Sequence, residues 1–198
     1  MNDLKELLSN RQNIIITTHV NPDGDAIGSS LALKNFLDKL GHQTNIIVPN
    51  DYPEFLKWMK NNNSIINFSS SKDLSEKLIV KSDIIFCLDF NNLSRINDLG
   101  KLISNSSSQK ILIDHHLDPE DFYDFKIHDV KASATAELIY DLLFELDSSL
   151  IDKDISDCIY TGILTDTGSF KFSSTSSKVH RIVADLIDRG VDISSISN

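Results

Sequence analysis

Three short apolar runs most constrain the fold of this chain. They are NIIITT at 13–18, DIIFCL at 83–88 and KILI at 110–113. Each is rich in isoleucine and lacks the polar alternation of a strand with one exposed face, so each predicts a strand buried on both faces of a parallel sheet. Segments with helical periodicity separate these runs. Strands that alternate with helices predict an α/β fold, in which a parallel sheet lies between two layers of helices.

The rest of the chain supplies further elements of the same kinds. We predict a strand at Gln43–Val48 and an edge strand near Phe125–His128. Helices are predicted at 4–10, 25–40, 53–60, 73–80, 93–103, 134–146, 155–164 and 177–189. Gly28, inside the second helix, would let another helix approach closely because it has no side chain. Three side chains of the third helix are predicted to pack onto the sheet: Phe55, Trp58 and Met59.

The composition is that of an ordinary soluble protein with one core. Of 198 residues, 40% are hydrophobic and 24% are charged, which is enough for one well-buried domain. The longest apolar runs are far shorter than the ~20 residues that span a bilayer, and the N-terminus is polar and charged, so we expect neither a membrane segment nor a secretory signal. Cys87 and Cys158 are predicted to be buried reduced thiols, which fits a cytoplasmic protein.

The net charge of −10 and the pI of about 4.9 limit the partners of the chain. Tight binding of long nucleic acid needs a basic surface, so long duplexes are not expected as partners. Short nucleotides and phosphate esters remain compatible with this charge, because bound divalent cations can supply the positive charge that the side chains lack.

The residues that carry chemistry follow the three apolar runs. The first run leads to a histidine and two aspartates, the second to one aspartate, and the third to an aspartate and two histidines. In chain order these are His19, Asp23, Asp25, Asp89, Asp114, His115 and His116. The carboxyl ends of parallel strands lie at one edge of a sheet, where ligand sites form. We therefore expect these side chains to meet in one crevice.

Each motif also has a purely structural explanation. An Asp before a helix often serves as its N-cap, which stabilises the helix by roughly 1 kcal/mol. The segment HVNPDGD places three ionisable groups within seven residues, however, and they would repel one another without a cation, so we favour metal ligation. His115 and His116 could be solvated loop residues, or they could point to a metal and to a substrate oxygen. Asp166, within TDTGSF, could belong to an ordinary turn.

The count of charges agrees with a dinuclear metal site. Two divalent cations would balance four carboxylates and leave two imidazoles as neutral ligands. The six candidate ligands are His19, Asp23, Asp25, Asp89, His115 and Asp166. Mixed carboxylate and imidazole ligands suit manganese, magnesium or iron better than a structural zinc site, which prefers thiolates. We therefore expect two divalent cations, with manganese favoured over magnesium or iron.

Taken together, HVNPDGDAIGS, the strand-end Asp89, DHH at 114–116 and TDTGSF at 165–170 resemble the motifs of the DHH phosphoesterase superfamily. Within it, the chain is most similar to the bacterial bifunctional oligoribonucleases (nanoRNases) that are also pAp phosphatases. The resemblance implies one metal held by His19, Asp23, Asp89 and Asp166, and a second held by Asp25, Asp89, His115 and Asp166. It also implies that His116 contacts the scissile phosphate and that Asp114 orients the neighbouring imidazoles.

The activity implied by this resemblance is hydrolysis of phosphoester bonds by a hydroxide that bridges the two metals. The expected substrates are short oligoribonucleotides, pAp (3′-phosphoadenosine 5′-phosphate) or both, with Asp89, Asp114 and His116 as catalytic residues. Inorganic pyrophosphatase, cyclic-dinucleotide phosphodiesterase and long-strand exonuclease remain alternatives within the superfamily. A nucleotide- or metal-binding module without catalysis is the alternative outside enzymes. No membrane partner is expected, and a homodimer is left open.

Members of the superfamily carry a second, C-terminal DHH-associated domain with a Gly-rich, His-containing substrate motif, which this sequence lacks. We therefore expect residues 1–190 to form the DHH catalytic domain and 191–198 to begin an interdomain linker, with the C-terminal domain absent from the chain. The three histidines outside the motifs, His42, His128 and His180, are expected to be structural.

Overall fold

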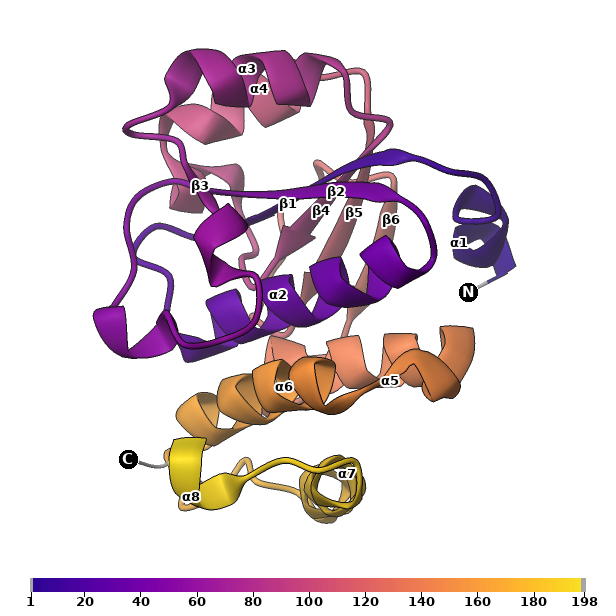
Figure 1. The fold of residues 1–198 in the computed structure, drawn as a ribbon. Coiled ribbons are helices and arrows are strands. Elements are labelled where there is room, and N and C mark those ends of the chain that lie inside the picture. The colour runs from indigo at the N-terminus through magenta and orange to yellow at the C-terminus, as the bar shows by residue number, and fades with distance from the viewer. Residues whose placement is uncertain (1, 197–198) are drawn as a thin grey trace.

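The computed structural model describes residues 2–196 and contains a six-stranded sheet with the strand order β3-β2-β1-β4-β5-β6 (Figure 1). Every strand pairing is parallel. The strands are β1 (Asn13–Thr18), β2 (Gln43–Val48), β3 (Ile66–Asn67), β4 (Ile84–Leu88), β5 (Gln109–Asp114) and β6 (Phe125–His128). Helices cover both faces of the sheet, so the predicted three-layer α/β fold is confirmed.

Eight α-helices accompany the sheet within the described residues. They are α1 (Asn2–Leu7), α2 (Gly24–Lys39), α3 (Lys72–Val80), α4 (Asp98–Asn105), α5 (Thr135–Asp147), α6 (Lys153–Asp166), α7 (Ser177–Asp188) and α8 (Ile193–Ile196). None of these helices is both long and apolar enough to cross a membrane.

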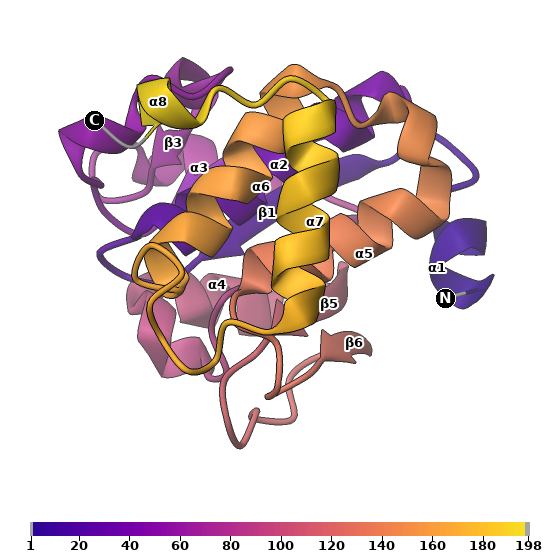
Figure 2. The same ribbon diagram turned by 90° about the horizontal axis from the view of Figure 1, so that it is seen from below.

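The two faces of the sheet are covered to different depths. On the face that we call the deep face, α2 and α5 pack on the strands, α6 packs on both of these helices, and α7 lies outside α5 and α6 (Figures 1 and 2). On the other, the shallow face, α3 and α4 form a single layer. Each face of the sheet has its own hydrophobic core. Successive residues of β1 lie in different cores, because successive side chains of a strand point to opposite faces. Ile14 and Ile16 lie in the larger core of the deep face, and Ile15 lies in the smaller one.

The predicted helix at 53–60 is wrong. Only Glu54–Leu56 forms a single 3-10 turn, and Asn61, with a left-handed φ of 65°, ends the turn that follows. Asparagines favour such turns because their side chains compete for backbone hydrogen bonds. Met59 is buried as predicted, but Phe55 and Trp58 are 67% and 47% exposed, so the two aromatic side chains do not pack onto the sheet.

Two further elements differ from the prediction. The expected helix at 93–103 is interrupted at Asn97, whose φ of 51° and ψ of −133° separate a 3-10 turn at Leu93–Ile96 from α4. The edge strand β3 was not predicted, because two residues carry no recognisable periodicity.

The close approach predicted for Gly28 is confirmed. A Cβ atom at this position would lie 2.4 Å from the backbone carbonyl oxygen of Cys158 on α6. A Cβ atom at Gly162, also on α6, would lie 2.6 Å from Cβ of Ala136 on α5 and 2.9 Å from a carboxylate oxygen of Asp25 on α2. The deep-face helices α2, α5 and α6 therefore pack closely at a place where α2 and α6 each have a glycine. Cys158 and the other cysteine, Cys87, are buried and free, as predicted.

Candidate metal centre

The chemistry-bearing residues lie at the carboxyl edge of the sheet, around the boundary between β1 and β4. On one side of this boundary the strands follow in the order β1, β2, β3, and on the other side in the order β4, β5, β6. The boundary is therefore the topological switch point of the sheet, where open α/β sheets bind ligands. His19 follows β1, Asp89 follows β4 and Asp114 ends β5. The predicted convergence of the strand-end motifs is therefore observed.

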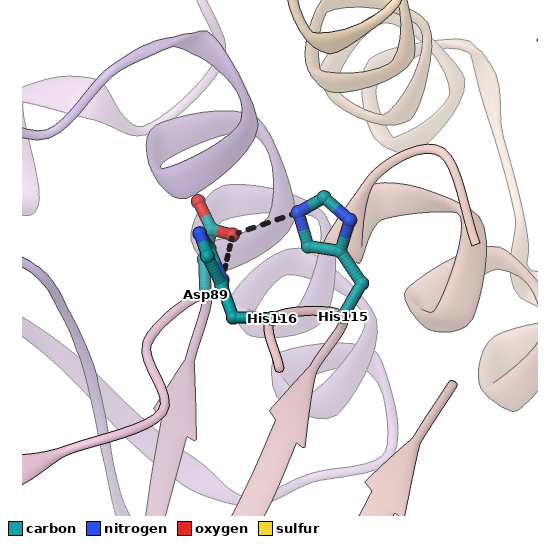
Figure 3. Close-up of side chains that lie close together, drawn as sticks. All are labelled: Asp89, His115 and His116. Atoms are coloured by element: carbon teal, nitrogen blue, oxygen red, sulfur yellow. Dashed lines mark ion pairs between the residues drawn. The ribbon is translucent and has the colours of Figure 1, made fainter. Parts of the chain in front are cut away.

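Asp89 lies at the centre of the site and is 2% exposed. It has a left-handed φ of 63°, which is uncommon for a residue with a side chain and is typical of strained positions in functional sites. Oδ2 of Asp89 lies 3.3 Å from Nε2 of His19, and Oδ1 lies 3.6 Å from Nε2 of His115. Figure 3 shows Oδ1 between the rings of His115 and His116. One buried carboxylate is thus shared by imidazoles from two different loops.

Backbone carbonyl groups hold the rings of His19 and His115 through Nδ1, the ring nitrogen that faces away from Asp89. Nδ1 of His19 lies 2.9 Å from the carbonyl oxygen of Val20, and Nδ1 of His115 lies 3.1 Å from that of Ala132. A proton on each Nδ1 would donate these bonds and leave each Nε2 with a free lone pair that faces the carboxylates. Histidines that bind metals in proteins are commonly oriented in this way.

Asp23 is both the N-cap of α2 and a neighbour of His19. Its Oδ1 accepts hydrogen bonds from the backbone N–H groups of Asp25 and Ala26 at 3.1 and 3.0 Å. Its Oδ2 lies 3.8 Å from Nε2 of His19. The capping and the ligand interpretations of this aspartate are therefore compatible, because they use different oxygens.

Asp25 is fully buried in the first turn of α2, where its carboxylate meets the N-terminus of α5. Oδ2 accepts from the backbone N–H of Thr135 at 2.6 Å, and Oδ1 accepts from that of Ala136 at 2.8 Å and from the hydroxyl of Ser29 at 3.2 Å. The peptide dipoles of α5 place partial positive charge at this end of the helix, so they stabilise the buried carboxylate.

Asp166 is the last residue of α6, two residues beyond the predicted end of this helix, and its Oδ2 lies 3.4 Å from Nε2 of His115. Within the described residues, three overlapping groups have potential ligand atoms within 4.8 Å of one another. These are His19 with Asp23 and Asp89; Asp25 with His115 and Asp166; and Asp89 with His115 and His116. The structure thus brings all six candidate ligands together, and their roles as ligands stay a prediction.

Asp114 and His116 form a hydrogen-bonded pair next to Asp89. Nδ1 of His116 donates to Oδ1 of Asp114 at 2.7 Å, and Asp114 is fully buried whereas the side chain of His116 is 38% exposed. Asp114 thus orients His116, whereas the backbone of Ala132 orients His115. The proton on Nδ1 leaves Nε2 of His116 available for a further partner.

The crowding of like charges shifts the pKa values of the site. Burial, and then repulsion from Asp89 and Asp166, raises the pKa of Asp25 well above its ordinary value. Burial alone would lower the pKa of His115, but hydrogen bonds to Asp166 and Asp89 outweigh it and raise that pKa. The pKa of His19 is raised in the same way by Asp89. The site therefore attracts positive charge, and a divalent cation would compete with protons for it.

Two contributors escaped the sequence analysis. Thr135 donates its hydroxyl to Oδ1 of Asp89 at 3.0 Å, but it lies in the run of small residues ASATA at 132–136, which resembles no catalytic or metal-binding motif. His128, expected to be merely structural, has its Nε2 2.6 Å from the carbonyl oxygen of His116. The register that pairs His128 of β6 with Asp114 of β5 explains this contact, and a register could not be read from the sequence.

Comparisons with known proteins indicate the family of the chain. Residues 13–163 match the DHH family, N-terminal domain. The bifunctional oligoribonuclease and PAP phosphatase NrnA of Thermus thermophilus is 34% identical over 185 residues, which are 93% of this chain and 52% of that protein. An exopolyphosphatase-related protein from Bacteroides fragilis, known from its crystal structure, is 41% identical, with a TM-score of 0.96 that covers 98% of this chain and 58% of that one.

A more distant structure shows the same fold. Exonuclease RecJ bound to manganese has a TM-score of 0.60 at 15% identity, over 94% of this chain and 47% of that chain. The chain spans about half the length of the curated relatives that it matches. The resemblance inferred from the motifs is confirmed by these matches. The chain belongs to the DHH family, and its residues 13–163 correspond to the N-terminal domain of that family.

Proposed function

We propose that this chain carries the centre of a two-metal phosphoesterase that hydrolyses short oligoribonucleotides, pAp or both. The observation that carries the proposal is the buried carboxylate of Asp89, whose two oxygens lie 3.3 and 3.6 Å from imidazoles that follow different strands. The Thermus thermophilus relative, a bifunctional oligoribonuclease and PAP phosphatase, supports this choice of substrates.

The donor atoms fit two divalent cations that prefer oxygen and imidazole ligands. Two of the observed groups, His19 with Asp23 and Asp89, and Asp25 with His115 and Asp166, are parts of the two ligand sets that the family resemblance implies. In those implied sets Asp89 and Asp166 are shared. One cation would be held by His19, Asp23, Asp89 and Asp166, and the other by Asp25, Asp89, His115 and Asp166. When bound, the cations would supply Lewis-acid chemistry, because they lower the pKa of water and neutralise charge on the phosphoryl group. Manganese is the favoured cation, and magnesium or iron also suits these ligands.

The chain itself would position the substrate through His116. His116 is half-exposed and hydrogen-bonded to buried Asp114, so its Nε2 can reach a phosphate oxygen from a fixed direction. Nε2 of His116 would hydrogen-bond to that oxygen, and Asp114 would hold the ring in place through its contact with Nδ1. The net charge of −10 favours short substrates, since the protein surface would repel a long phosphate backbone.

We also propose the domain division expected from the sequence, with the catalytic domain at 1–190 and an interdomain linker beginning at 191. Val191 is still buried against the core, and Ile193–Ile196 forms the short helix α8; residues 197 and 198 lie outside the described residues.

The alternative functions would use the same metal centre. These alternatives are a pyrophosphatase, a cyclic-dinucleotide phosphodiesterase and a non-catalytic binding module. A homodimer is compatible with each of them.

The test is hydrolysis by the metal-free chain with and without added Mn²⁺. The substrates are a short RNA, pAp, pyrophosphate and a cyclic dinucleotide, assayed side by side. We expect Mn²⁺-dependent turnover of the RNA or of pAp. Turnover of pyrophosphate or of the cyclic dinucleotide alone would redirect the proposal to that activity. Mn²⁺ binding without turnover of any substrate would favour a binding module.

Two variants test the central role of Asp89. Asp89→Asn and Asp89→Ala should reduce turnover by more than about 100-fold, the upper range for residues that merely orient ligands. Circular dichroism should show folded protein in both cases. Glu76→Gln, on the shallow face, is the matched control and should leave turnover unchanged. Retained Mn²⁺-dependent activity in Asp89→Ala would refute the proposal that Asp89 is a ligand of both cations.

A further inference from the structure

Thr135, the first residue of α5, contacts two of the proposed ligands at once. Its hydroxyl donates a hydrogen bond to Oδ1 of Asp89 at 3.0 Å, and its backbone N–H donates to Oδ2 of Asp25 at 2.6 Å. Its side chain is fully buried. Under the proposed function, Asp89 is shared by both cations and Asp25 belongs to one of them. Thr135 therefore connects Asp89, a proposed ligand of both cations, to Asp25, a proposed ligand of one cation.

The start of α5 is built around this contact and has no local cap. Ala134 occupies the N-cap position and makes no side-chain hydrogen bond to the helix. Alanine is a poor N-cap, so the free N–H groups of the first turn need another acceptor. They find it in Asp25, which accepts from Thr135 and Ala136 although it lies 110 and 111 residues away in sequence. The helix thus begins directly on a proposed ligand.

Neighbours of Thr135 hold the same segment in place. The carbonyl oxygen of Ala132 meets Nδ1 of His115 at 3.1 Å. The backbone N–H of Ser133 donates to Glu137 at 2.9 Å, and its hydroxyl donates to the carbonyl oxygen of Ser174, in the loop after Asp166, at 2.6 Å. Both the backbone and the side chains of residues 132–135 are held by hydrogen bonds. The segment can therefore hold the carboxylates of Asp25 and Asp89 in defined positions.

We infer that Thr135 is a positioning residue of the metal centre. Its hydroxyl fixes the rotation of the Asp89 carboxylate, and its backbone sets the spacing between Asp89 and Asp25. This inference rests on the proposed function and deepens it. Thr135 reaches the ligands and not the reacting atoms, so it acts through them. Residues that orient metal ligands contribute about 10- to 100-fold to metal affinity or activity.

The ordinary alternative is that Thr135 only stabilises the fold as a buried first residue of a helix. The two interpretations differ in what depends on the hydroxyl. Thr135→Val keeps the shape and the backbone N–H but removes the hydroxyl, and Thr135→Ser keeps the hydroxyl. Thr161→Val is the matched control, because Thr161 is also buried and its hydroxyl donates to the backbone carbonyl of Asp157 at 2.8 Å, within α6.

The experiment is a calorimetric titration of Mn²⁺ into each metal-free chain, followed by electron paramagnetic resonance at saturation. Interacting pairs of Mn²⁺ ions and isolated ions give different spectra, so this readout is independent of turnover. We expect Thr135→Val to bind Mn²⁺ about 10- to 100-fold more weakly and to lose the spectrum of the interacting pair. Thr135→Ser should restore both, and Thr161→Val should bind like the wild type even if urea unfolding shows it to be less stable.

Each other outcome decides the matter. Wild-type affinity and spectrum in Thr135→Val would overturn the inference and leave the proposed function intact, as would equal losses in Thr135→Val and Thr135→Ser. If Thr135→Val does not fold, Thr135→Ala, which adds no bulk, takes its place under the same criteria. A wild-type chain that binds no Mn²⁺ would overturn the proposed function, and the inference would fall with it.

Discussion

The deep and shallow faces of the sheet make unequal contributions to the candidate centre. Every helical residue that reaches the centre comes from the deep face: Asp25 from α2, Thr135 from α5 and Asp166 from α6. The shallow face instead has a groove of about 350 Å³ between α3 and α4, next to the 82% exposed Val80. Close packing from several directions fixes a side chain to within a fraction of an ångström. Around the centre, α2, α5 and α6 of the deep face provide this packing.

The largest expected effect separates two neighbouring residues of β1. Ile16 and Ile15 are both buried, but Ile16 lies in the deep core and Ile15 in the shallow one. Ile16→Ala should lower the free energy of unfolding by about 4 kcal/mol and Ile15→Ala by about 2 kcal/mol, because α3 and α4 can collapse into the space more readily. Urea unfolding measures both. Equal losses would contradict the difference between the faces, and Ile84→Ala with Ile85→Ala repeats the comparison in β4.

A second comparison uses two glycines with nearly the same clash. An added Cβ would lie 2.4 Å from the Cys158 carbonyl oxygen at Gly28, and 2.5 Å from the Leu93 carbonyl oxygen at Gly100. Gly28→Ala should cost about 3 kcal/mol because two packed helices must separate, whereas Gly100→Ala should cost about 1 kcal/mol because only a nearby turn must move. Thermal and urea unfolding test this order, and a larger loss in Gly100→Ala would reverse the argument.

Metal binding should stabilise the two faces unequally. Free Mn²⁺ at 100 times its dissociation constant should raise the free energy of unfolding by about 2.7 kcal/mol, provided that the unfolded chain does not bind it. Hydrogen exchange should slow in α2, α5 and α6, which carry Asp25, Thr135 and Asp166, and change little in α3 and α4. Asp89→Asn is the control and should show neither effect. Uniform slowing of exchange over both faces would contradict the comparison.

The smallest expected effect concerns a buried histidine at the opposite edge of the sheet. Burial lowers the pKa of His42 from 6.5, against a weaker opposing effect of Asp38, whereas the carboxylates of the centre raise the pKa of His115. Near pH 6.5 and below, His42 therefore binds more protons in the unfolded chain than in the folded chain. The contribution of His42 to the free energy of unfolding thus falls as the pH drops below 6.5. His42→Asn retains an acceptor for the N–H of Gln12 and should weaken the fall between pH 7 and 5. An identical pH profile for both proteins would refute this assignment.

The sequence predicted the positions of the candidate site residues better than it predicted the parts of the fold that surround them. His19, Asp89 and Asp114 could be placed because each follows an apolar run, and parallel strands bring such positions together whatever their order. The break at Asn97 and the exposure of Trp58 depend on local turns that periodicity does not reveal. The role of Thr135 depends on which helix N-terminus meets Asp25, a tertiary contact with no local signal.

The long-range cap of α5 also bears on the order in which the chain acquires its structure. Asp25 and Thr135 are separated by 110 residues, and Asp166 emerges from the ribosome later still. Contacts between residues so far apart slow folding, because a long loop must close before they form. Synthesis must therefore pass residue 166 before the six candidate ligands can assemble, so a nascent chain would not form the proposed metal centre until the domain is nearly complete.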